Sequence, residues 1–290
     1  MKDEFSEIVK DILNKDKNIS VLEKLSKTKN PCYIIQDSEG NKYFLKISNH
    51  EDCIQREIRA IEFYSRNNLA NIVKITSYNR NSLVTFYEDG LEELDHVEMI
   101  RELSSFHQRS LNHHNFEEFS NDKIFQHETR DKAIKRTKKY ENIISEIGNP
   151  IEFRSFLLTM SPEDFKIFPR ILCHGDPHKW NIMRRADGST IFLDEEFAAY
   201  TEPTFDIARS IVSGNPEDLY SSIGLYIEFM KETPMMKHGE STLTRAILYD
   251  VVSQSISRVL SYRKRHQNDD LAKKQINKIK SLMDYIFDSK

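Results

Sequence analysis

Short runs of β-forming residues, separated by turn-forming residues, dominate the first 90 positions of the chain. The turn-forming residues at 37–41 predict that the runs on either side of them, Cys32–Ile35 and Tyr43–Ile47, form a hairpin. Residues 51–66 instead place their apolar side chains at helical spacing, as residues 1–16 also do. We therefore expect a small antiparallel sheet that carries a helix. The predicted strands are Val21–Leu25, Cys32–Ile35, Tyr43–Ile47, Ile72–Ile75 and Ser82–Tyr87.

After Gly90 the apolar positions follow the 3.6-residue period of helices. Further helices are expected near 130–147 and between 217 and 287. The pattern thus predicts an α+β fold of two parts, with a small antiparallel sheet at 1–90 and a larger, mainly helical part at 91–290.

Composition excludes several classes of protein. The chain has 290 residues, of which 38% are hydrophobic, and this is enough apolar surface to exclude wholesale disorder. None of its 8 glycines falls in a GxxxxGKS or GxGxxG arrangement, which excludes a Walker-type cradle and a Rossmann fingerprint. Three separated cysteines favour neither a disulfide framework nor a zinc site, so we expect Cys32, Cys53 and Cys173 to be buried as small hydrophobic residues.

Charge narrows the range of partners. The chain carries 42 basic and 46 acidic side chains, a formal net charge of −4, without long runs of one sign. This distribution argues against a nucleic-acid partner and favours small molecules. No stretch approaches 18 consecutive apolar residues, so we expect a cytoplasmic protein with no membrane partner. The oligomeric state is left open.

A polar stretch interrupts the helical part. Apolar strands expected at Ile171–Cys173 and Ile191–Leu193 flank it, and Asp187-Gly188 within it favours a tight turn. The stretch begins His174-Gly175-Asp176-Pro177-His178-Lys179-Trp180-Asn181, and Asp194-Glu195-Glu196 follows the second strand. Functional side chains often lie in such loops.

The spacing of three oxygen-bearing side chains in this stretch is specific. An Asp, then an Asn five positions later, then an Asp at the end of the next strand match the catalytic-loop layout of kinase-like phosphotransferases. The carboxylate of Asp176 can accept the proton of an attacking hydroxyl, while Asn181 and Asp194 offer hard oxygen ligands to Mg²⁺. We expect the three side chains to converge around one divalent ion.

A phosphate-binding lobe also needs a cation, and Lys46 lies in an apolar strand where it can supply one. In the helix that follows, Glu57 shares a face with Ile61 and Tyr64, whereas Glu62 lies on another side. We therefore predict an ion pair between Lys46 and Glu57.

Four features together resemble the aminoglycoside phosphotransferase and choline kinase superfamily. They are HGDxxxxN at 174–181, a strand that ends at Asp194, Glu196, and Phe205-Asp206-Ile207-Ala208. The resemblance implies a two-lobed, protein-kinase-like fold, with a nucleotide-binding lobe at 1–90 and the catalytic loop and acceptor site at 91–290. It implies transfer of the γ-phosphate of ATP to a hydroxyl of a small molecule, with Mg²⁺ as cofactor and GTP open as an alternative donor.

The same resemblance assigns roles to individual residues. It implies that Asp176 is the catalytic base and that Asn181 and Asp194 are metal ligands. It also implies that His174 and Asp206 brace the catalytic loop.

The nucleotide candidates beyond Lys46 and Glu57 are less direct. The segment at 25–31, where the resemblance places a phosphate-covering loop, contains no glycine. Ser26 and Thr28 could contact phosphate there, although an ordinary strand connection is the favoured alternative. By resemblance, adenine should bind near Phe86, Tyr87 and Glu88.

The acceptor is expected between the catalytic loop and the C-terminal helices. An acidic and aromatic wall would suit a cationic acceptor such as an aminoglycoside or a choline-like alcohol, but sugars and other metabolites remain open. His178 could equally be a solvated loop residue, and Glu196 could orient a metal ligand. The candidate residues are His178, Glu195, Glu196, Tyr200 and Glu202.

Two other functions compete with the kinase. A metal-dependent phosphohydrolase could use the histidine, aspartate and asparagine side chains of the polar stretch, but most other histidines lie in helical or other loop segments. A pseudokinase that only senses nucleotide would explain the glycine-poor loop, yet Asp176, Asn181 and Asp194 are all intact.

Overall fold

The computed structural model describes most of the chain. The described residues are 19–25, 30–113, 116–126, 145–146, 155, 162–214, 218–264 and 268–288. The predicted helices at 1–16 and near 130–147 lie almost wholly outside this set, as do Ser26 and Thr28. No helix among the described residues is both long and apolar enough to cross a membrane.

The chain divides into two compact units. The first comprises residues up to Leu94 together with Trp180–Ala198, and the second comprises Asp95–Lys179 and Ala199–Lys290. The sequence pattern suggested one break, after residue 90. The structure differs because Trp180–Ala198 forms strands that pair and pack within the first unit.

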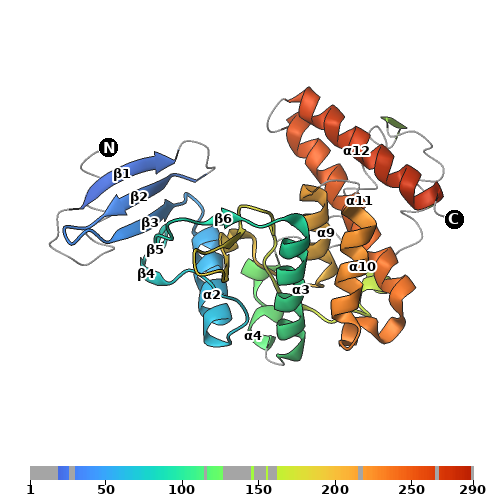
Figure 1. Cartoon of the computed structure of the whole chain (residues 1–290), viewed down its shortest axis with the longest axis horizontal. Coiled ribbons are helices and arrows are strands. Elements are labelled where there is room, and N and C mark those ends of the chain that lie inside the picture. Colours follow the sequence, from blue (N-terminus) through green and yellow to red (C-terminus); the bar gives the residue numbers. More distant parts are fainter. Residues whose placement is uncertain are drawn as a thin grey trace. The chain divides into compact units, whose positions relative to one another are not determined.

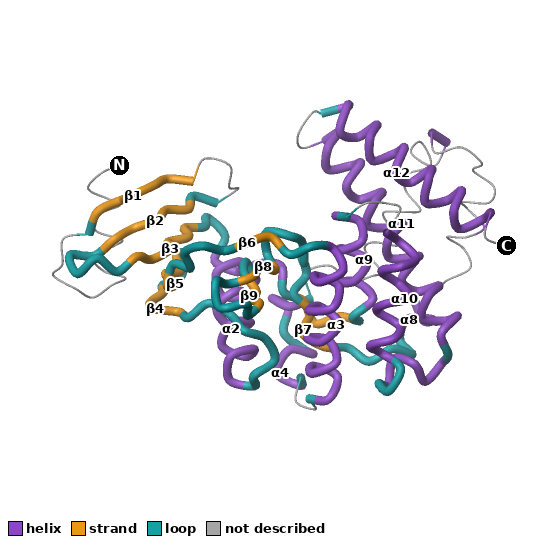
Figure 2. The backbone as a smooth tube through the Cα atoms, in the orientation of Figure 1, coloured by secondary structure: helices purple, strands orange, loops and turns teal. Residues whose placement is uncertain are grey.

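The first unit contains a five-stranded antiparallel sheet, seen in Figures 1 and 2. Its order is β1 (Ser20–Leu25), β2 (Cys32–Gln36), β3 (Lys42–Ile47), β5 (Ser82–Phe86) and β4 (Ile75–Tyr78). The predicted hairpin of β2 and β3 is confirmed. At its turn the Asp37 carboxylate accepts hydrogen bonds from the backbone amides of Glu39 and Asn41.

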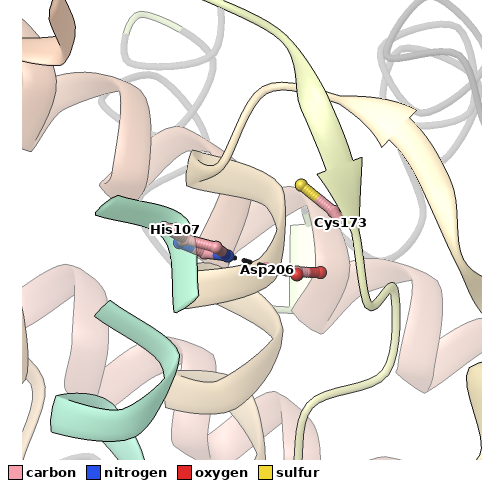
Figure 3. A group of neighbouring side chains, drawn as sticks. All are labelled: His107, Cys173 and Asp206. Carbon is pink, nitrogen blue, oxygen red and sulfur yellow. Dashed lines mark hydrogen bonds and ion pairs between the residues drawn. The ribbon is translucent and has the colours of Figure 1, made fainter. Parts of the chain in front are cut away.

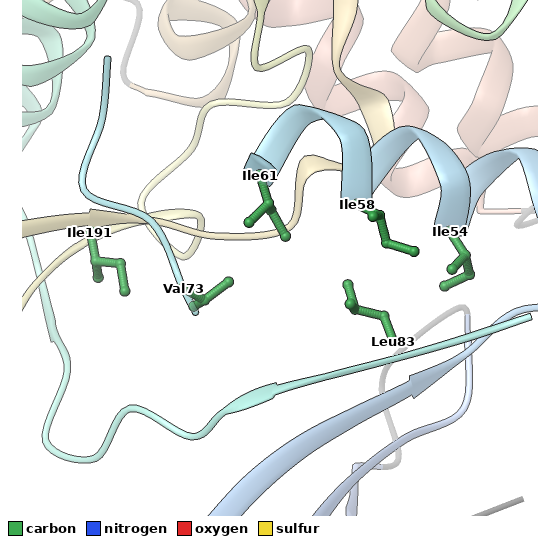
Figure 4. Close-up of a cluster of buried hydrophobic side chains, with 6 residues drawn as sticks. All are labelled: Ile54, Ile58, Ile61, Val73, Leu83 and Ile191. Atoms are coloured by element: carbon green, nitrogen blue, oxygen red, sulfur yellow. The ribbon is translucent and has the colours of Figure 1, made fainter. Parts of the chain in front are cut away.

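Helix α2 (Glu51–Arg66) packs its apolar face on this sheet. Figure 4 shows how side chains of α2, of the sheet and of a later hairpin meet in one cluster. Burying these apolar groups stabilises the unit and brings residues near 191 to α2. The cluster consists of Ile54, Ile58, Ile61, Val73, Leu83 and Ile191.

A second sheet of the first unit has the order β6 (Glu92–Glu93), β8 (Ile182–Arg184) and β9 (Thr190–Phe192). The predicted turn at Asp187-Gly188 joins β8 to β9, and Gly188 has φ 83°, which glycine adopts without steric cost. Ile72 makes only a single bridge to Phe192, so the strand predicted at Ile72–Ile75 begins instead at Ile75.

The second unit is mainly helical. Its strand β7 (Ile171–Cys173) pairs with β10 (Ala199–Thr201), whereas the other predicted flanking strand, β9, pairs with β8. Its described helices and helical turns are α3 (His96–Asn112), α4 (Glu117–Ser120), η1 (Lys123–Phe125), α8 (Pro162–Phe165), α9 (Thr204–Ser213), α10 (Leu219–Met230), η4 (Pro234–His238), α11 (Glu240–Lys264) and α12 (Asp269–Asp288). The short helical turn η2 (Glu195–Phe197) belongs to the first unit.

The cysteines follow the sequence expectation in part. Cys32 and Cys173 are buried and not disulfide-bonded, as expected. The prediction for Cys53 is wrong, because this residue is only half-buried near the start of α2.

Candidate active site

Lys46 is the centre of a charge cluster in the first unit. Its Nζ lies 2.8 Å from Glu57 Oε2, which is the ion pair expected from the helix spacing. It also lies 2.5 Å from Asp194 Oδ1 and 2.9 Å from Glu196 Oε2. Burial alone would lower the pKa of Lys46, but the three carboxylates together raise it well above its ordinary value. The ammonium group is therefore charged.

Two of these carboxylates are themselves buried. Burial raises the pKa of Glu57 to about 7, against the opposing effect of Lys46. Glu196 accepts a hydrogen bond of 2.8 Å from Asn30 Nδ2 on its Oε2, and its backbone carbonyl accepts one from Arg56. These contacts fix Glu196 beside Lys46 and Asp194. Its role as a carboxylate that orients a metal ligand stays a prediction.

Asp194 is the accessible member of the cluster. It follows β9 and has φ 62° and ψ 65°, a left-handed conformation that is uncommon outside glycine and costs free energy. Its side chain is 42% exposed, whereas those of Lys46, Glu57 and Glu196 are 6–7% exposed. The strained backbone thus directs one carboxylate of the cluster outward.

The β8–β9 hairpin brings the two predicted metal ligands to one end. Leu193 directly precedes Asp194, and its backbone amide donates a 2.8 Å hydrogen bond to the carbonyl of Asn181. Oxygens of Glu57, Asp194 and Glu196 lie within 4.8 Å of one another. Three carboxylates around one ammonium leave negative charge in excess, and hard oxygen donors are what Mg²⁺ prefers. These residues fit a Mg²⁺ ion.

Asp176 lies in the loop after β7, in the second unit. Its Oδ1 accepts a 2.7 Å hydrogen bond from Arg209 Nε on α9, and its Oδ2 lies 3.6 Å from His178 Nε2. Burial alone would raise the pKa of Asp176, but Arg209 and His178 lower it below its ordinary value. The carboxylate is therefore ionised and can accept a proton. Its convergence with Asn181 and Asp194 of the first unit stays a prediction.

Asp206 holds the loop after β7, which is the predicted catalytic loop, through backbone contacts. Its carboxylate accepts hydrogen bonds of 2.8 Å from the amides of both His174 and Gly175. His107 Nε2 lies 3.3 Å from Asp206 Oδ2, and Figure 3 draws this contact as a dashed line. His107 Nδ1 lies 3.0 Å from the Tyr226 hydroxyl. The expected bracing partners are thus in contact, with His174 acting through its backbone.

Cys173 also approaches this group, and its sulfur lies within 4.8 Å of ligand atoms of His107 and Asp206. All three side chains are fully buried, and both oxygens of Asp206 already accept loop amides. The arrangement is that of a structural brace and leaves Asp206 few lone pairs for a metal ion.

Other predicted residues are engaged elsewhere. Glu88 makes a forked ion pair with Arg185, with distances of 2.8 and 3.0 Å, while Phe86 is 40% exposed. The Lys42 ammonium lies 5.8 Å from the Tyr87 ring centroid. Glu195 is fully buried in the first unit. Contacts of Glu88 and Tyr87 thus shape the segment where adenine is expected.

The acidic and aromatic wall expected for the acceptor already has a cation. The Arg170 guanidinium lies 5.0 Å from the Tyr200 ring centroid, and its Nε lies 3.6 Å from Glu202 Oε1. Glu202 is buried and also accepts a hydrogen bond from Thr201. Arg170 therefore offsets the negative charge that this wall would offer to a ligand.

Sequence reasoning missed two residues that contact the catalytic loop or its brace. Arg209 lies three positions after Asp206 on α9, so the helical period could have placed both on one face. His107 belongs to α3, about 100 positions earlier, and nothing in its own segment indicates the contact.

A model of the family described as "Phosphotransferase enzyme family" matches residues 22–220, about two thirds of the chain. The chain belongs to this family. The predicted membership of a phosphotransferase superfamily is thereby confirmed. No curated protein matches the sequence of this phosphotransferase.

Solved structures share its fold. A choline kinase from Streptococcus pneumoniae is 18% identical with a TM-score of 0.60, over 98% of this chain and 99% of the other. APH(2")-IIia in a complex with GDP and kanamycin is 15% identical with a TM-score of 0.64, over 94% and 96%. An ADP-bound aminoglycoside phosphotransferase, APH(2'')-Ib, is 14% identical with a TM-score of 0.60, over 97% of each chain. At these identities the likeness shows the fold, and the predicted kinase-like α+β class is confirmed.

Proposed function

We propose that this phosphotransferase is a small-molecule kinase, which moves the γ-phosphate of ATP to a hydroxyl group. The observation that best supports the proposal is the buried Lys46, held by Glu57 and Asp194 at 2.8 and 2.5 Å. A fixed, charged lysine beside an exposed carboxylate is the arrangement that kinases use for nucleotide phosphates and their metal ion.

In this proposal the first unit binds the nucleotide. Lys46 would contact the α- and β-phosphates, and its ion pair with Glu57 would keep its ammonium in place. Asn181 and Asp194 would hold Mg²⁺, which when bound neutralises charge on the phosphates. The segment Phe86–Glu88 would contact the adenine. ADP and GDP bound to structural neighbours support a nucleotide, and GTP remains open as an alternative donor.

The second unit supplies the base. The ionised carboxylate of Asp176 would accept the hydroxyl proton as the acceptor oxygen forms its bond to the γ-phosphorus. The bond between the γ-phosphorus and the β–γ bridging oxygen breaks, and the nucleoside diphosphate leaves. Because the transition state is loose, holding the hydroxyl and the phosphate in line contributes more than the strength of the base. Asp206 would serve this alignment by fixing the loop.

The acceptor in this proposal is a small alcohol. Choline and kanamycin, which are named with two of the neighbours, are cationic. The sequence also led us to expect a cationic acceptor, bound by Glu195, Tyr200 and Glu202. Since Arg170 engages Tyr200 and Glu202, these residues do not support a cationic acceptor over a neutral or anionic one. A cytoplasmic location, with access to ATP, belongs to the same proposal.

A test of the proposal measures ADP release with ATP and Mg²⁺ over a panel of alcohols. We expect acceptor-dependent ADP release, which Asp194→Asn abolishes and Asp187→Asn leaves intact. Asp187 is a suitable control because it is an exposed aspartate in the turn of the same hairpin. Stabilisation by ATP without turnover on any alcohol would favour a nucleotide sensor, and phosphate release without an acceptor would favour a phosphohydrolase.

A further inference from the structure

Two nitrogen-bearing side chains approach the two oxygens of the Asp176 carboxylate. Arg209 contacts one of its oxygens at 2.7 Å and His178 lies 3.6 Å from the other. Burial and then the charge of Arg209 lower the pKa of Arg258 to about 10, while Tyr262 and Asp176 oppose this shift. Arg209 is therefore the guanidinium that contacts Asp176, and the charge of Arg258 acts on the same region without a contact to this carboxylate.

The guanidinium of Arg209 is only partly used. Its Nε donates to Asp176 Oδ1, and within the described part of the chain its two Nη atoms have no hydrogen-bond partner. Its side chain is 29% exposed. A guanidinium has a forked set of donors and can bind two anions at once, one through Nε and one through the Nη pair. Arg209 thus has donors left for an anion beside the base.

Arg258 differs from Arg209 in this respect. Its Nη1 donates to the Val212 carbonyl and its Nη2 to the Ser213 hydroxyl, at the end of α9. These contacts explain Arg258 as a cation at a helix C-terminus, where positive charge is favourable. It contributes to the local field, while Arg209 is the residue with donors to offer.

We propose that the acceptor carries an anionic group, a carboxylate or a phosphate, in addition to the hydroxyl that is phosphorylated, and that the Nη pair of Arg209 binds this group. The inference rests on the proposed kinase function. Because Nε of the same guanidinium holds Asp176, binding the anion on Arg209 places a neighbouring hydroxyl beside the base. Arg209 is then the residue that determines acceptor specificity.

Matched acceptors that differ in one anionic group test this inference. The pairs are D-glycerate with glycerol, L-homoserine with 3-aminopropan-1-ol, and ribose 5-phosphate with ribose, so the first two ask about a carboxylate and the third about a phosphate. We expect kcat/KM to favour the anionic member of at least one pair. Arg209→Gln should raise KM for that member about 10- to 100-fold, the range for a lost hydrogen bond to a charged group. Because Arg209 also holds Asp176, kcat should fall for both members, whereas the rise in KM should be confined to the anionic member.

The same substitution at Arg263 is the matched control. Arg263 lies on α11 in the same unit, and its ion-pair partners among the described residues are Glu146 and Asp269. Arg263→Gln should leave the preference unchanged. If Arg209→Gln unfolds, Arg209→Lys replaces it, since lysine retains the charge but lacks the fork and should still raise KM.

Equilibrium binding by calorimetry separates this inference from the function. Binding of D-glycerate or ribose 5-phosphate that Arg209→Gln weakens at least tenfold, and Arg263→Gln does not, would support the anion site even without turnover. Absence of ADP release on every alcohol would then count against the kinase alone. Conversely, turnover on neutral or cationic alcohols with no preference for anions, or no Arg209-dependent anion binding, would overturn the inference and leave the kinase standing.

Discussion

Lys46 Nζ lies 2.5 Å from Asp194 Oδ1, although the two residues are 148 positions apart in the chain. The contact depends on Ile191, which packs against α2 and so carries the end of β9 towards β3. The packing of apolar side chains around Ile191 thus brings Asp194 to the charged group around Lys46. Asp194 retains 42% side-chain exposure while its partner is buried, so the pair leaves an oxygen for a ligand.

Removing the lysine should destabilise the first unit. Lys46→Met would leave Glu57 and Glu196 buried with no opposing ammonium, and breaking a buried ion pair costs roughly 3 to 5 kcal/mol. Urea denaturation would measure the loss. The double variant with Glu57→Gln should lose less than the sum of the two single variants, because it also removes one unpaired charge.

Lys42→Met is the matched control for this prediction. Lys42 lies on the same strand, β3, and its ion pair with Asp89 is exposed to solvent, where such pairs contribute little. Equal losses in the two lysine variants would contradict a special role of the buried cluster.

The sequence predicted local relationships better than distant ones. Glu57 could be assigned to Lys46 because helical spacing alone separates it from Glu62, which is exposed. That Asp194 and Glu196 join the same lysine could not be predicted, since their positions depend on how a hairpin packs against α2. Local patterns set the direction of a side chain, whereas its distant partners follow from tertiary packing.

The partners of Asp206 and Asp176 also could not be predicted from the sequence. The sequence motif pointed to Asp206, but not to the fact that its partners are two backbone amides. His107 lies on α3 in a segment whose apolar spacing predicts only a helix. Arg209 could have been recognised from its position one helical turn after Asp206, yet its contact with Asp176 required the structure.

Asp206→Asn should loosen the catalytic loop. The two amides bond different oxygens of Asp206, and in asparagine one of these positions is an NH2 group, which cannot accept. We expect a loss of stability of about 2 kcal/mol and faster hydrogen exchange at the Gly175 amide. Asp284→Asn, at an exposed position of α12, should change neither. Unaltered exchange at Gly175 would rule out the brace.

Two glycine substitutions should act in opposite directions. Gly175 has φ 86° in the catalytic loop, so Gly175→Ala forces an L side chain into the left-handed region, at about 1 to 2 kcal/mol. Gly224 lies within α10, where nothing lies within 4 Å of an added Cβ. Gly224→Ala should therefore stabilise the protein, by about 0.5 to 1 kcal/mol. Thermal unfolding of the two variants checks both signs, and a stabilised Gly175→Ala would contradict the first.

Lys278 should make stability depend on pH. Burial and then the charge of Arg258 lower its pKa to about 8, against 10.5 in its ordinary state. Between these values the unfolded chain binds more protons than the folded one, so the free energy of unfolding rises with pH through this window and the penalty is fully present below pH 8. The Lys278 ammonium donates to the carbonyls of Val212 and Gly214, and it interacts electrostatically with Arg258 and His96. Lys278→Gln removes the titrating group but retains a donor for a carbonyl. We therefore expect the wild type to gain stability relative to Lys278→Gln between pH 7 and about pH 9.5, measured by urea denaturation at both values. A constant difference between the two proteins would mean that the ammonium is not strained by its surroundings.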